Sequence, residues 1–173
     1  MKRGAVWALV TLCGCQQLND AISPPPKTLS DEKHTLEITV PGTWGPDQIN
    51  EQAVLQVSNR IKDEYVIVLS EPKEDLADMD LLKFSEVTRA LQLKQMSNTS
   101  EEGPLPRTLN GMPAIEWVLN GTARNANVTM KHVAISGSKN YHQLLAWTVK
   151  SKWEQEKATL DSVISTLKET GAK

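Results

Sequence analysis

Apolar and polar residues alternate in several short stretches of the chain, a pattern that predicts β-strands. The first stretch covers residues 35–40 and ends at Pro41 and Gly42, which favour a turn. Alternation returns at residues 53–58. Residues 65–69 form a continuous run of mostly β-branched residues, as expected of a strand that is buried on both faces. This part of the chain therefore predicts three strands.

Between residues 75 and 95 the apolar residues recur at helical spacing instead, which predicts a first long helix. We expect one face of this helix to be buried, and the side chains on that face are Ala77, Phe84, Val87 and Leu91. The acidic residues of the region crowd the amino end, where the helix dipole favours negative charge. They are Glu74, Asp75, Asp78 and Asp80.

Turn-forming residues separate the later elements. The segment 97–107 is rich in Ser, Glu and Pro and is expected to be a loop. Asn110–Gly111 is a strong hairpin signal, because both residue types tolerate the positive φ of a tight turn. A strand is predicted for residues 113–119, and a second turn is expected at residues 120–121.

A second hairpin and a helix complete the predicted chain. Residues 128–136 and 141–149 are expected to pair with each other. Ser151 and Glu154 have the spacing of a capping box, in which each side chain satisfies a backbone donor at the start of a helix. The helix that follows is expected to reach about residue 169. Strands and helices in this order around a mostly antiparallel sheet predict an α+β sandwich.

The length and charge of the chain narrow the class of protein. A chain of 173 residues fits one domain with a core of its own. The 19 Lys and Arg residues are outnumbered by 21 Asp and Glu residues, so the formal charge is −2. A nucleic-acid-binding protein would have a strongly basic surface instead. We therefore expect no nucleic-acid partner.

The amino end has the pattern of a secretory signal peptide. Two basic residues precede an apolar stretch at residues 5–12, which is too short to span a bilayer. Residues 12–15, Leu-Cys-Gly-Cys, resemble the bacterial lipoprotein box, in which the last cysteine receives the lipid. The resemblance implies that residues 1–14 are removed and that Cys15 is diacylated and N-acylated, for example with palmitate. The alternative is an ordinary signal peptide in which the cysteines lie by chance.

The lipoprotein resemblance also implies a location. The residue after the lipidated cysteine is Gln16 rather than Asp, which in such lipoproteins implies the outer membrane, on its periplasmic face. Residues 15–34 are polar and include three consecutive prolines, so we expect the lipidated cysteine to begin a flexible tether. A single domain is then expected at residues 35–170, with the membrane as its partner through the lipid anchor.

A search for catalytic and metal-binding patterns yields no site. The histidines His34, His132 and His142 lack metal-ligand spacing. If Ser136 pairs with Tyr141, then His132 and His142 lie on opposite faces of the sheet and cannot share an ion. We interpret them as surface or half-buried structural residues. The acids near the first helix lack the pattern of a calcium loop. We find no nucleophile elbow or phosphate-binding loop, and expect no enzyme activity, no metal and no cofactor.

The tryptophans offer the remaining candidate for a functional surface. Trp117, Trp147 and Trp153 fall on apolar faces and are expected in the core. Trp44 follows a Pro-Gly pair at the end of a strand, where it either caps the sheet edge or is exposed for a partner. We favour the structural role and keep Trp44 as a candidate for the partner surface.

A family resemblance is carried by the segments 40–44, 66–68, 72–77, 109–111 and 164–167. With these segments, the order of the predicted elements resembles the PsbP-like fold, and the mature part is similar to DcrB-type envelope lipoproteins. The resemblance covers most of residues 36–167. It implies an α+β domain with a mostly antiparallel sheet sandwiched by helices. It also implies a non-enzymatic binding or accessory module in envelope maintenance or uptake, with an envelope protein as its partner.

Two other functions remain open: a carrier of a small apolar ligand, and a hydrolase with an unrecognised site. An enclosed apolar cavity would favour the carrier. A convergent polar cluster with perturbed pKa values would favour the hydrolase. A filled core with an exposed patch, near Trp44 or at residues 97–107, would favour the binding module.

Overall fold

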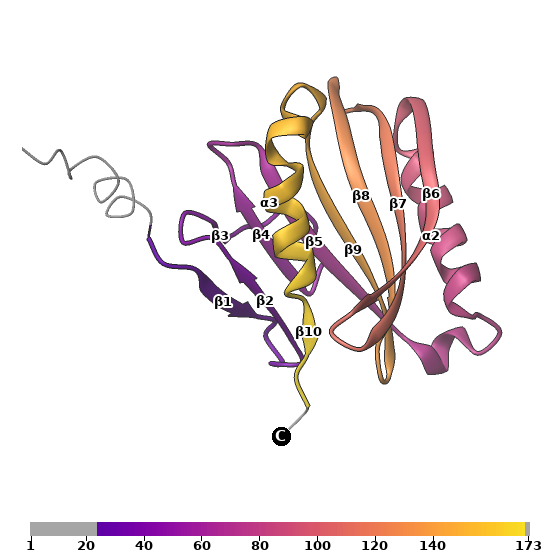
Figure 1. The fold of residues 1–173 in the computed structure, drawn as a ribbon. Helices are drawn as coiled ribbons and strands as arrows, with labels where there is room; N and C mark the ends of the chain where they lie inside the picture. The colour runs from indigo at the N-terminus through magenta and orange to yellow at the C-terminus, as the bar shows by residue number, and fades with distance from the viewer. Residues whose placement is uncertain (1–23, 172–173) are drawn as a thin grey trace, which may run out of the picture.

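Residues 24–171 are the part of the chain that the computed structural model describes (Figure 1). The predictions for residues 1–23, lipidation of Cys15 among them, lie outside these residues. The helices are the short 3-10 helices η1 (Lys73–Leu76) and η2 (Lys150–Lys152) and the α-helices α2 (Leu81–Lys94) and α3 (Trp153–Ser165). None of the helices in this part of the chain has the length and apolar character to cross a bilayer. The strands are β1 (Lys27–Ser30), β2 (Leu36–Val40), β3 (Gly45–Pro46), β4 (Leu55–Asn59), β5 (Glu64–Pro72), β6 (Ser97–Leu109), β7 (Met112–Ala123), β8 (Ala126–Ser136), β9 (Asn140–Val149) and β10 (Lys168–Glu169).

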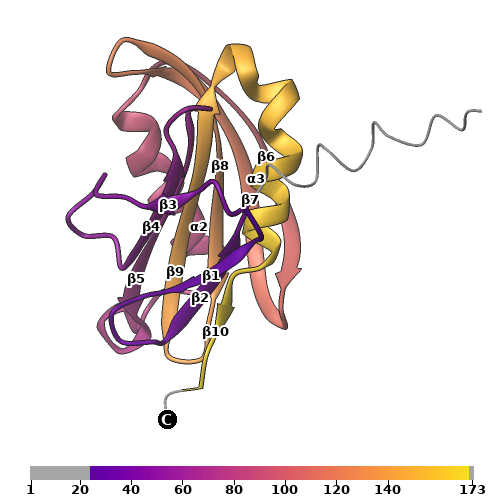
Figure 2. The same ribbon diagram turned by 90° about the vertical axis from the view of Figure 1, so that its left-hand side faces the viewer.

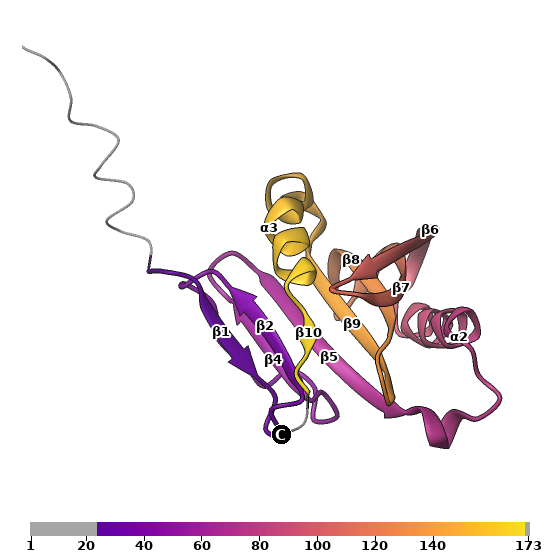
Figure 3. The same cartoon turned by 60° about the horizontal axis from the view of Figure 1, so that its bottom comes forward.

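The strands form two antiparallel sheets. The larger sheet has seven strands in the order β3-β4-β5-β9-β8-β7-β6, and the smaller sheet has three in the order β1-β2-β10. The smaller sheet and α3 pack on one face of the larger sheet, and α2 packs on its other face (Figure 2, Figure 3). The α+β fold class predicted from the sequence is confirmed.

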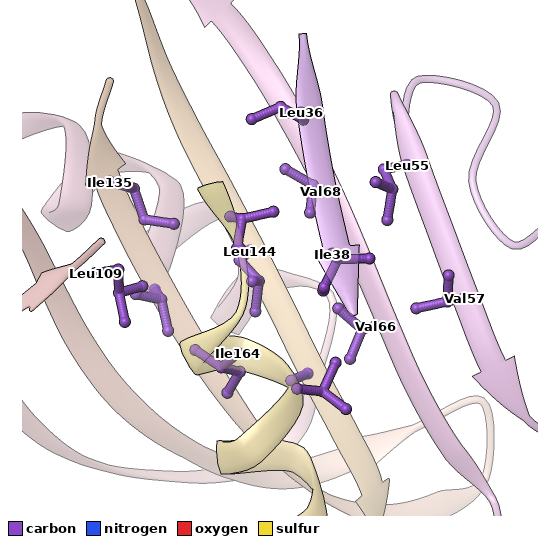
Figure 4. Packing of buried hydrophobic residues seen from close by; sticks show 14 of the residues in the cluster. Leu36, Ile38, Leu55, Val57, Val66, Val68, Leu109, Ile135, Leu144 and Ile164 are labelled. Carbon is purple, nitrogen blue, oxygen red and sulfur yellow. The ribbon is translucent and has the colours of Figure 1, made fainter. Parts of the chain in front are cut away.

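The main core lies between the larger sheet, α3 and the smaller sheet (Figure 4). Val66, Val68 and Leu144 point to this side from the central strands of the larger sheet. Ile164 of α3 and Ile38 of β2 meet them, and all five side chains are 0% exposed. Burial of such a side chain contributes roughly 1.5–3 kcal/mol, so this layer holds α3 and the smaller sheet in place.

Both predicted hairpins are present. β6 and β7 join at Asn110–Gly111, where φ is 48° and 87°, the positive values that an Asn-Gly turn provides. β8 and β9 pair with Ser136 opposite Tyr141, which is the predicted register. The second turn predicted at residues 120–121 is wrong. Gly121 lies within β7, and the chain reverses at Arg124–Asn125, where φ is again positive.

Both α-helices begin at residues other than the predicted ones. In α2 the Asp80 side chain accepts a hydrogen bond from the Lys83 backbone N–H at 2.8 Å, so it caps the helix and the acids before it lie outside. In α3 the predicted capping box at Ser151 is not formed, because residues 150–152 form η2. α3 also ends earlier than predicted, at Ser165, since the chain after it turns to pair with β2 as β10.

α2 buries a face that differs from the predicted one. Phe84 and Ser85 are buried against the larger sheet, whereas Val87 and Leu91 are 41% and 52% exposed. Ser85 turns inward because its Oγ accepts a hydrogen bond from the buried indole N–H of Trp117 at 2.9 Å. Phe84, which the predicted stripe includes, stacks on Tyr141 with ring centroids 5.0 Å apart, so this contact and the Ser85–Trp117 hydrogen bond together orient α2.

The segment predicted as a loop at residues 97–107 is an edge strand. β6 pairs with β7, with register shifts between Ser97 and Ser100 and between Glu102 and Leu105. Most of its side chains are exposed. An exposed edge strand needs no buried apolar face, and its composition can therefore be polar and contain proline. A loop has the same composition, which is why the sequence predicted a loop here.

The folded part of the chain begins before residue 35. β1 pairs with β2, with Leu29 opposite Ile38, so residues 27–30 belong to the smaller sheet rather than to a tether. Leu29 packs against the main core. A strand of four residues with one inward apolar side chain has too little pattern to stand out from the polar residues around it.

Candidate functional site

A cleft of about 640 Å³ opens where the two sheets meet. The turn between β1 and β2 forms one wall, and β3, β4 and the loop between them form the other. Ser70 and Pro72 of β5 and Asn140 of β9 complete the lining. Charged, amide and hydroxyl side chains dominate this lining, so the cleft suits a polar ligand or an exposed segment of another protein.

Two carboxylates in the cleft lining hold its walls in place. Asp31 accepts hydrogen bonds from the backbone N–H groups of Thr35 at 2.6 Å and Leu36 at 2.7 Å. Burial raises the pKa of Asp31, but these hydrogen bonds outweigh burial and bring the pKa below its ordinary value. Asp47 accepts a hydrogen bond from Arg60 Nε at 3.0 Å, and this pairing lowers the pKa of Asp47 to about 2. Both carboxylates are therefore ionised at neutral pH, and both accept hydrogen bonds from other groups of the protein.

Ser70, His142 and Glu169 form a chain of hydrogen bonds beside the cleft. Ser70 and His142 are opposite each other on β5 and β9, and Ser70 Oγ lies 2.7 Å from His142 Nδ1. His142 Nε2 lies 3.1 Å from Glu169 Oε1 on β10. The other carboxylate oxygen of Glu169 accepts a hydrogen bond from the Ser138 backbone N–H at 2.8 Å. The chain thus joins the larger sheet to the smaller one.

Burial and hydrogen bonding set the protonation of these groups. Burial lowers the pKa of His142 below its ordinary value, although the nearby Glu169 opposes this effect. Burial raises the pKa of Glu169, but hydrogen bonds from Ser138 and His142 outweigh it, so this pKa is lowered. At neutral pH the imidazole is neutral and the carboxylate is ionised. His142 Nε2–H therefore donates to Glu169, and Nδ1 accepts the hydroxyl proton of Ser70.

Serine, histidine and acid follow one another here as in a hydrolytic triad, but the two imidazole nitrogens are exchanged. In the usual triad Nε2 faces the serine and Nδ1 faces the acid. Gly137 packs directly on the contact, since a Cβ at this position would overlap Glu169 Oε1 and lie 2.7 Å from His142 Nε2. The arrangement can polarise the Ser70 hydroxyl at the cleft, and it fastens β10 to the larger sheet.

His132 lies on the opposite face of the larger sheet, as the predicted register requires. Its Nε2 lies 3.0 Å from Thr88 Oγ1 of α2, and burial lowers its pKa to about 4. The expectation that His132 and His142 are surface or half-buried is wrong, because they are 0% and 1% exposed. Each lies between the larger sheet and the layer that covers it. Among residues 24–171 no three His, Cys, Asp or Glu side chains form a group that could hold a metal ion.

Trp44 does not present a surface to a partner. Its side chain is 1% exposed and belongs to the main core. The turn after β2, closed by the Trp44 backbone N–H donating to the Pro41 carbonyl at 2.9 Å, directs the ring inward. In contrast, Leu105 of β6 is 56% exposed, so an exposed apolar residue does lie within residues 97–107.

No protein-family model and no curated protein matches the sequence. Solved structures do match. LpqN of Mycobacterium tuberculosis, which is involved in cell envelope biogenesis, has a TM-score of 0.61 at 12% identity, over 89% of this chain and 95% of that chain. The cyanobacterial PsbP (CyanoP) of Synechocystis sp. PCC 6803 has a TM-score of 0.58 at 14% identity, over 92% and 99%. The Ran-binding protein Mog1p of Saccharomyces cerevisiae has a TM-score of 0.56 at 10% identity, over 83% and 94%.

These matches establish the fold of the chain. It is a PsbP-like α+β domain, with an antiparallel sheet between helices, as the order of predicted elements implied. LpqN and Mog1p have different stated roles, so the shared fold does not by itself define a function, and the function must be argued from the site.

Proposed function

We propose that this chain is a non-enzymatic lipoprotein of the bacterial envelope that acts as a binding or accessory module through the cleft between its sheets. The observation that carries the proposal is a lipoprotein box at Cys15 followed by a PsbP-like domain. The similar fold of LpqN, whose stated role is in envelope biogenesis, supports the same setting. Two or three acyl chains on one cysteine give stable membrane attachment, so the domain would work beside a membrane.

The shape of the domain supports binding at the surface over carriage of an apolar ligand. The core between the larger sheet and α3 is filled with aliphatic side chains. The two hollows described for residues 24–171 are open and have polar and charged residues in their linings. A carrier of an apolar molecule would instead enclose it in an apolar cavity.

Fractionation of cells that produce Cys15→Ser tests the anchor. The unchanged protein should sediment with membranes and incorporate labelled palmitate, whereas Cys15→Ser should be soluble and unlabelled, with the same circular dichroism. Cys13→Ser is the matched control, because the lipid is expected on Cys15 alone. Equal sedimentation of all three proteins would count against lipidation. Density-gradient separation of the two membranes tests the outer-membrane location expected from Gln16.

Site-specific crosslinking in intact cells tests the cleft. A photoreactive residue at Gln52, which is exposed in the cleft lining, should crosslink to an envelope protein. The control position is Glu86, which is exposed on α2 at the other face of the larger sheet. Crosslinks from the control position alone, or the same crosslinks from both positions, would refute a role for the cleft.

A hydrolase is the second candidate, and the Ser70–His142–Glu169 chain is the observation that favours it. In that case Ser70 Oγ would attack a carbonyl carbon, His142 Nδ1 would take the hydroxyl proton and return it to the leaving group, and water would release the acyl group. A fluorophosphonate probe distinguishes the two functions. The accessory module predicts no labelling, whereas labelling that disappears in Ser70→Ala would establish the hydrolase.

A further inference from the structure

A second hollow, of about 520 Å³, lies at the opposite end of β5 from the cleft. One part of its lining is apolar and comes from residues 24–26 and from residues 41–44, which include Trp44. The other part is polar and comes from Asn59, Glu64, Lys62 and Thr159. The hollow therefore combines an apolar wall with one buried acid.

Glu64 lies two residues before Val66 on β5 and faces α3. The Glu64 residue is 0% exposed, and within the described part of the chain neither of its carboxylate oxygens has a hydrogen-bond partner. Glu156 of α3, which is 2% exposed, lies beside it. Two carboxylates can only accept, so they cannot hydrogen-bond to each other unless one of them carries a proton.

Few positive charges face this pair. Lys62, in the turn between β4 and β5, places its Nζ 3.4 Å from Glu156 Oε2. Lys152 does not supply a second positive charge to the pair, because its Nζ forms an ion pair with Asp63 Oδ2 at 2.7 Å. Burial, and then the neighbouring Glu156, raise the pKa of Glu64 to about 7, and Lys62 offsets only part of this.

The charges around Glu64 are therefore unbalanced by one positive charge. Glu64 and Glu156 would carry two negative charges, and Lys62 supplies one positive charge. A buried negative charge without a partner is costly, so the pair must take up a proton or another cation. Below about pH 7 a proton fills this role, because the pKa of Glu64 is raised to that value.

We propose that this hollow binds a small organic cation with a primary ammonium group, which replaces the proton held between Glu64 and Glu156. An ammonium group has three donors and no acceptor, and Glu64 offers two acceptor oxygens without partners. The prolines at residues 24–26 are exposed in the lining and can contact an apolar stem.

A divalent metal ion fits the same residues less well. Calcium takes six to eight oxygen ligands and magnesium requires an octahedron, whereas only two carboxylates converge here, with the Lys62 ammonium beside them. This site is separate from the cleft and from the Ser70–His142–Glu169 chain. Its test therefore does not depend on the function proposed above.

Calorimetric titration of the full-length protein in detergent with pentylamine tests the proposal. Binding is expected at pH 8 and should be about tenfold weaker at pH 6, because Glu64, with a pKa of about 7, is mostly ionised at the higher pH and mostly protonated at the lower. Pentylamine remains protonated at both pH values. Pentanol, which has the same stem without the charge, should not bind detectably.

Two variants show where the amine binds. Glu64→Gln keeps the size of the side chain and removes its charge, so it should abolish binding. Glu86→Gln, at an exposed acid on α2 that lines neither hollow, should leave binding unchanged. The proposal is overturned by three results: no binding to the unchanged protein at pH 8, equal affinities at pH 6 and pH 8, or calcium chloride binding in place of the amine. The pH comparison uses the unchanged protein, so it decides the matter even if Glu64→Gln fails to fold.

Discussion

Replacing Glu64 by Gln should make the protein more stable at alkaline pH. The unfolded chain releases the Glu64 proton near pH 4.5, whereas the folded protein holds it until about pH 7. The folded state therefore binds more protons than the unfolded state across this window. Stability that depends on Glu64 is fully present below pH 4.5, declines as the pH rises, and is lost above about pH 7.

The size of the effect follows from the same two values. A pKa that moves from 4.5 to about 7 corresponds to about 3 kcal/mol, at roughly 1.4 kcal/mol for each pH unit. Gln cannot ionise, so the variant should escape this loss. At a typical urea dependence of about 2 kcal/mol per molar, the midpoint of Glu64→Gln should exceed that of the unchanged protein by about 1.5 M at pH 8.

Urea unfolding followed by tryptophan fluorescence at pH 5, 6, 7 and 8 measures this difference. The comparison between the two proteins is needed because His132 and His142 act in the opposite direction. Their pKa values are lowered in the folded state, so their contribution grows as the pH rises towards about 6.5, the value in the unfolded chain, and is constant above it. They are the same in both proteins and cancel in the difference. Parallel pH profiles for the two proteins would refute the proton held at Glu64.

Two further substitutions test contacts elsewhere in the fold. Gly137→Ala should lower the free energy of unfolding by about 1–3 kcal/mol, because its Cβ would displace Glu169 from the larger sheet. Gly45→Ala is its control, since a Cβ there meets nothing within 4 Å, and equal effects in thermal melts would contradict the role of Gly137. Ser85→Ala should cost about 1–3 kcal/mol in urea unfolding, because it leaves the buried indole N–H of Trp117 without its acceptor. An unchanged midpoint would show that this hydrogen bond does not position α2.

The sequence predicted the elements with a buried, alternating face and missed those without one. The β8–β9 register was predictable because a slip by one residue would turn Val133 and Leu144 away from the core. β6 was missed because its side chains are mostly exposed and obey no alternation. The buried face of α2 was missed because Ser85 is fixed by Trp117, which lies 32 residues further along the chain.

The candidate sites depend on contacts between distant segments. Ser70 and His142 are 72 residues apart, and His142 and Glu169 are 27 apart. Glu169 reaches His142 only because residues 168–169 form β10, and a strand of two residues is too short to show an alternation of apolar and polar residues. Glu64 did carry a signal, since it stands two residues before Val66 on the inward face of the same strand. An acid at an inward position of a buried strand indicates an unusual protonation state.

Proline at both margins of the larger sheet limits how the protein can associate. β3, at one margin, is the dipeptide Gly45–Pro46, and β6, at the other, contains Pro104 and Pro106. Proline has no N–H to offer to an incoming strand, and the exposed acid Glu102 would repel an identical copy. Copies of the chain that meet at these margins therefore lack the backbone donors and the neutral edge that strand-to-strand pairing needs. A partner is therefore expected to contact side chains rather than to extend the larger sheet with a strand of its own.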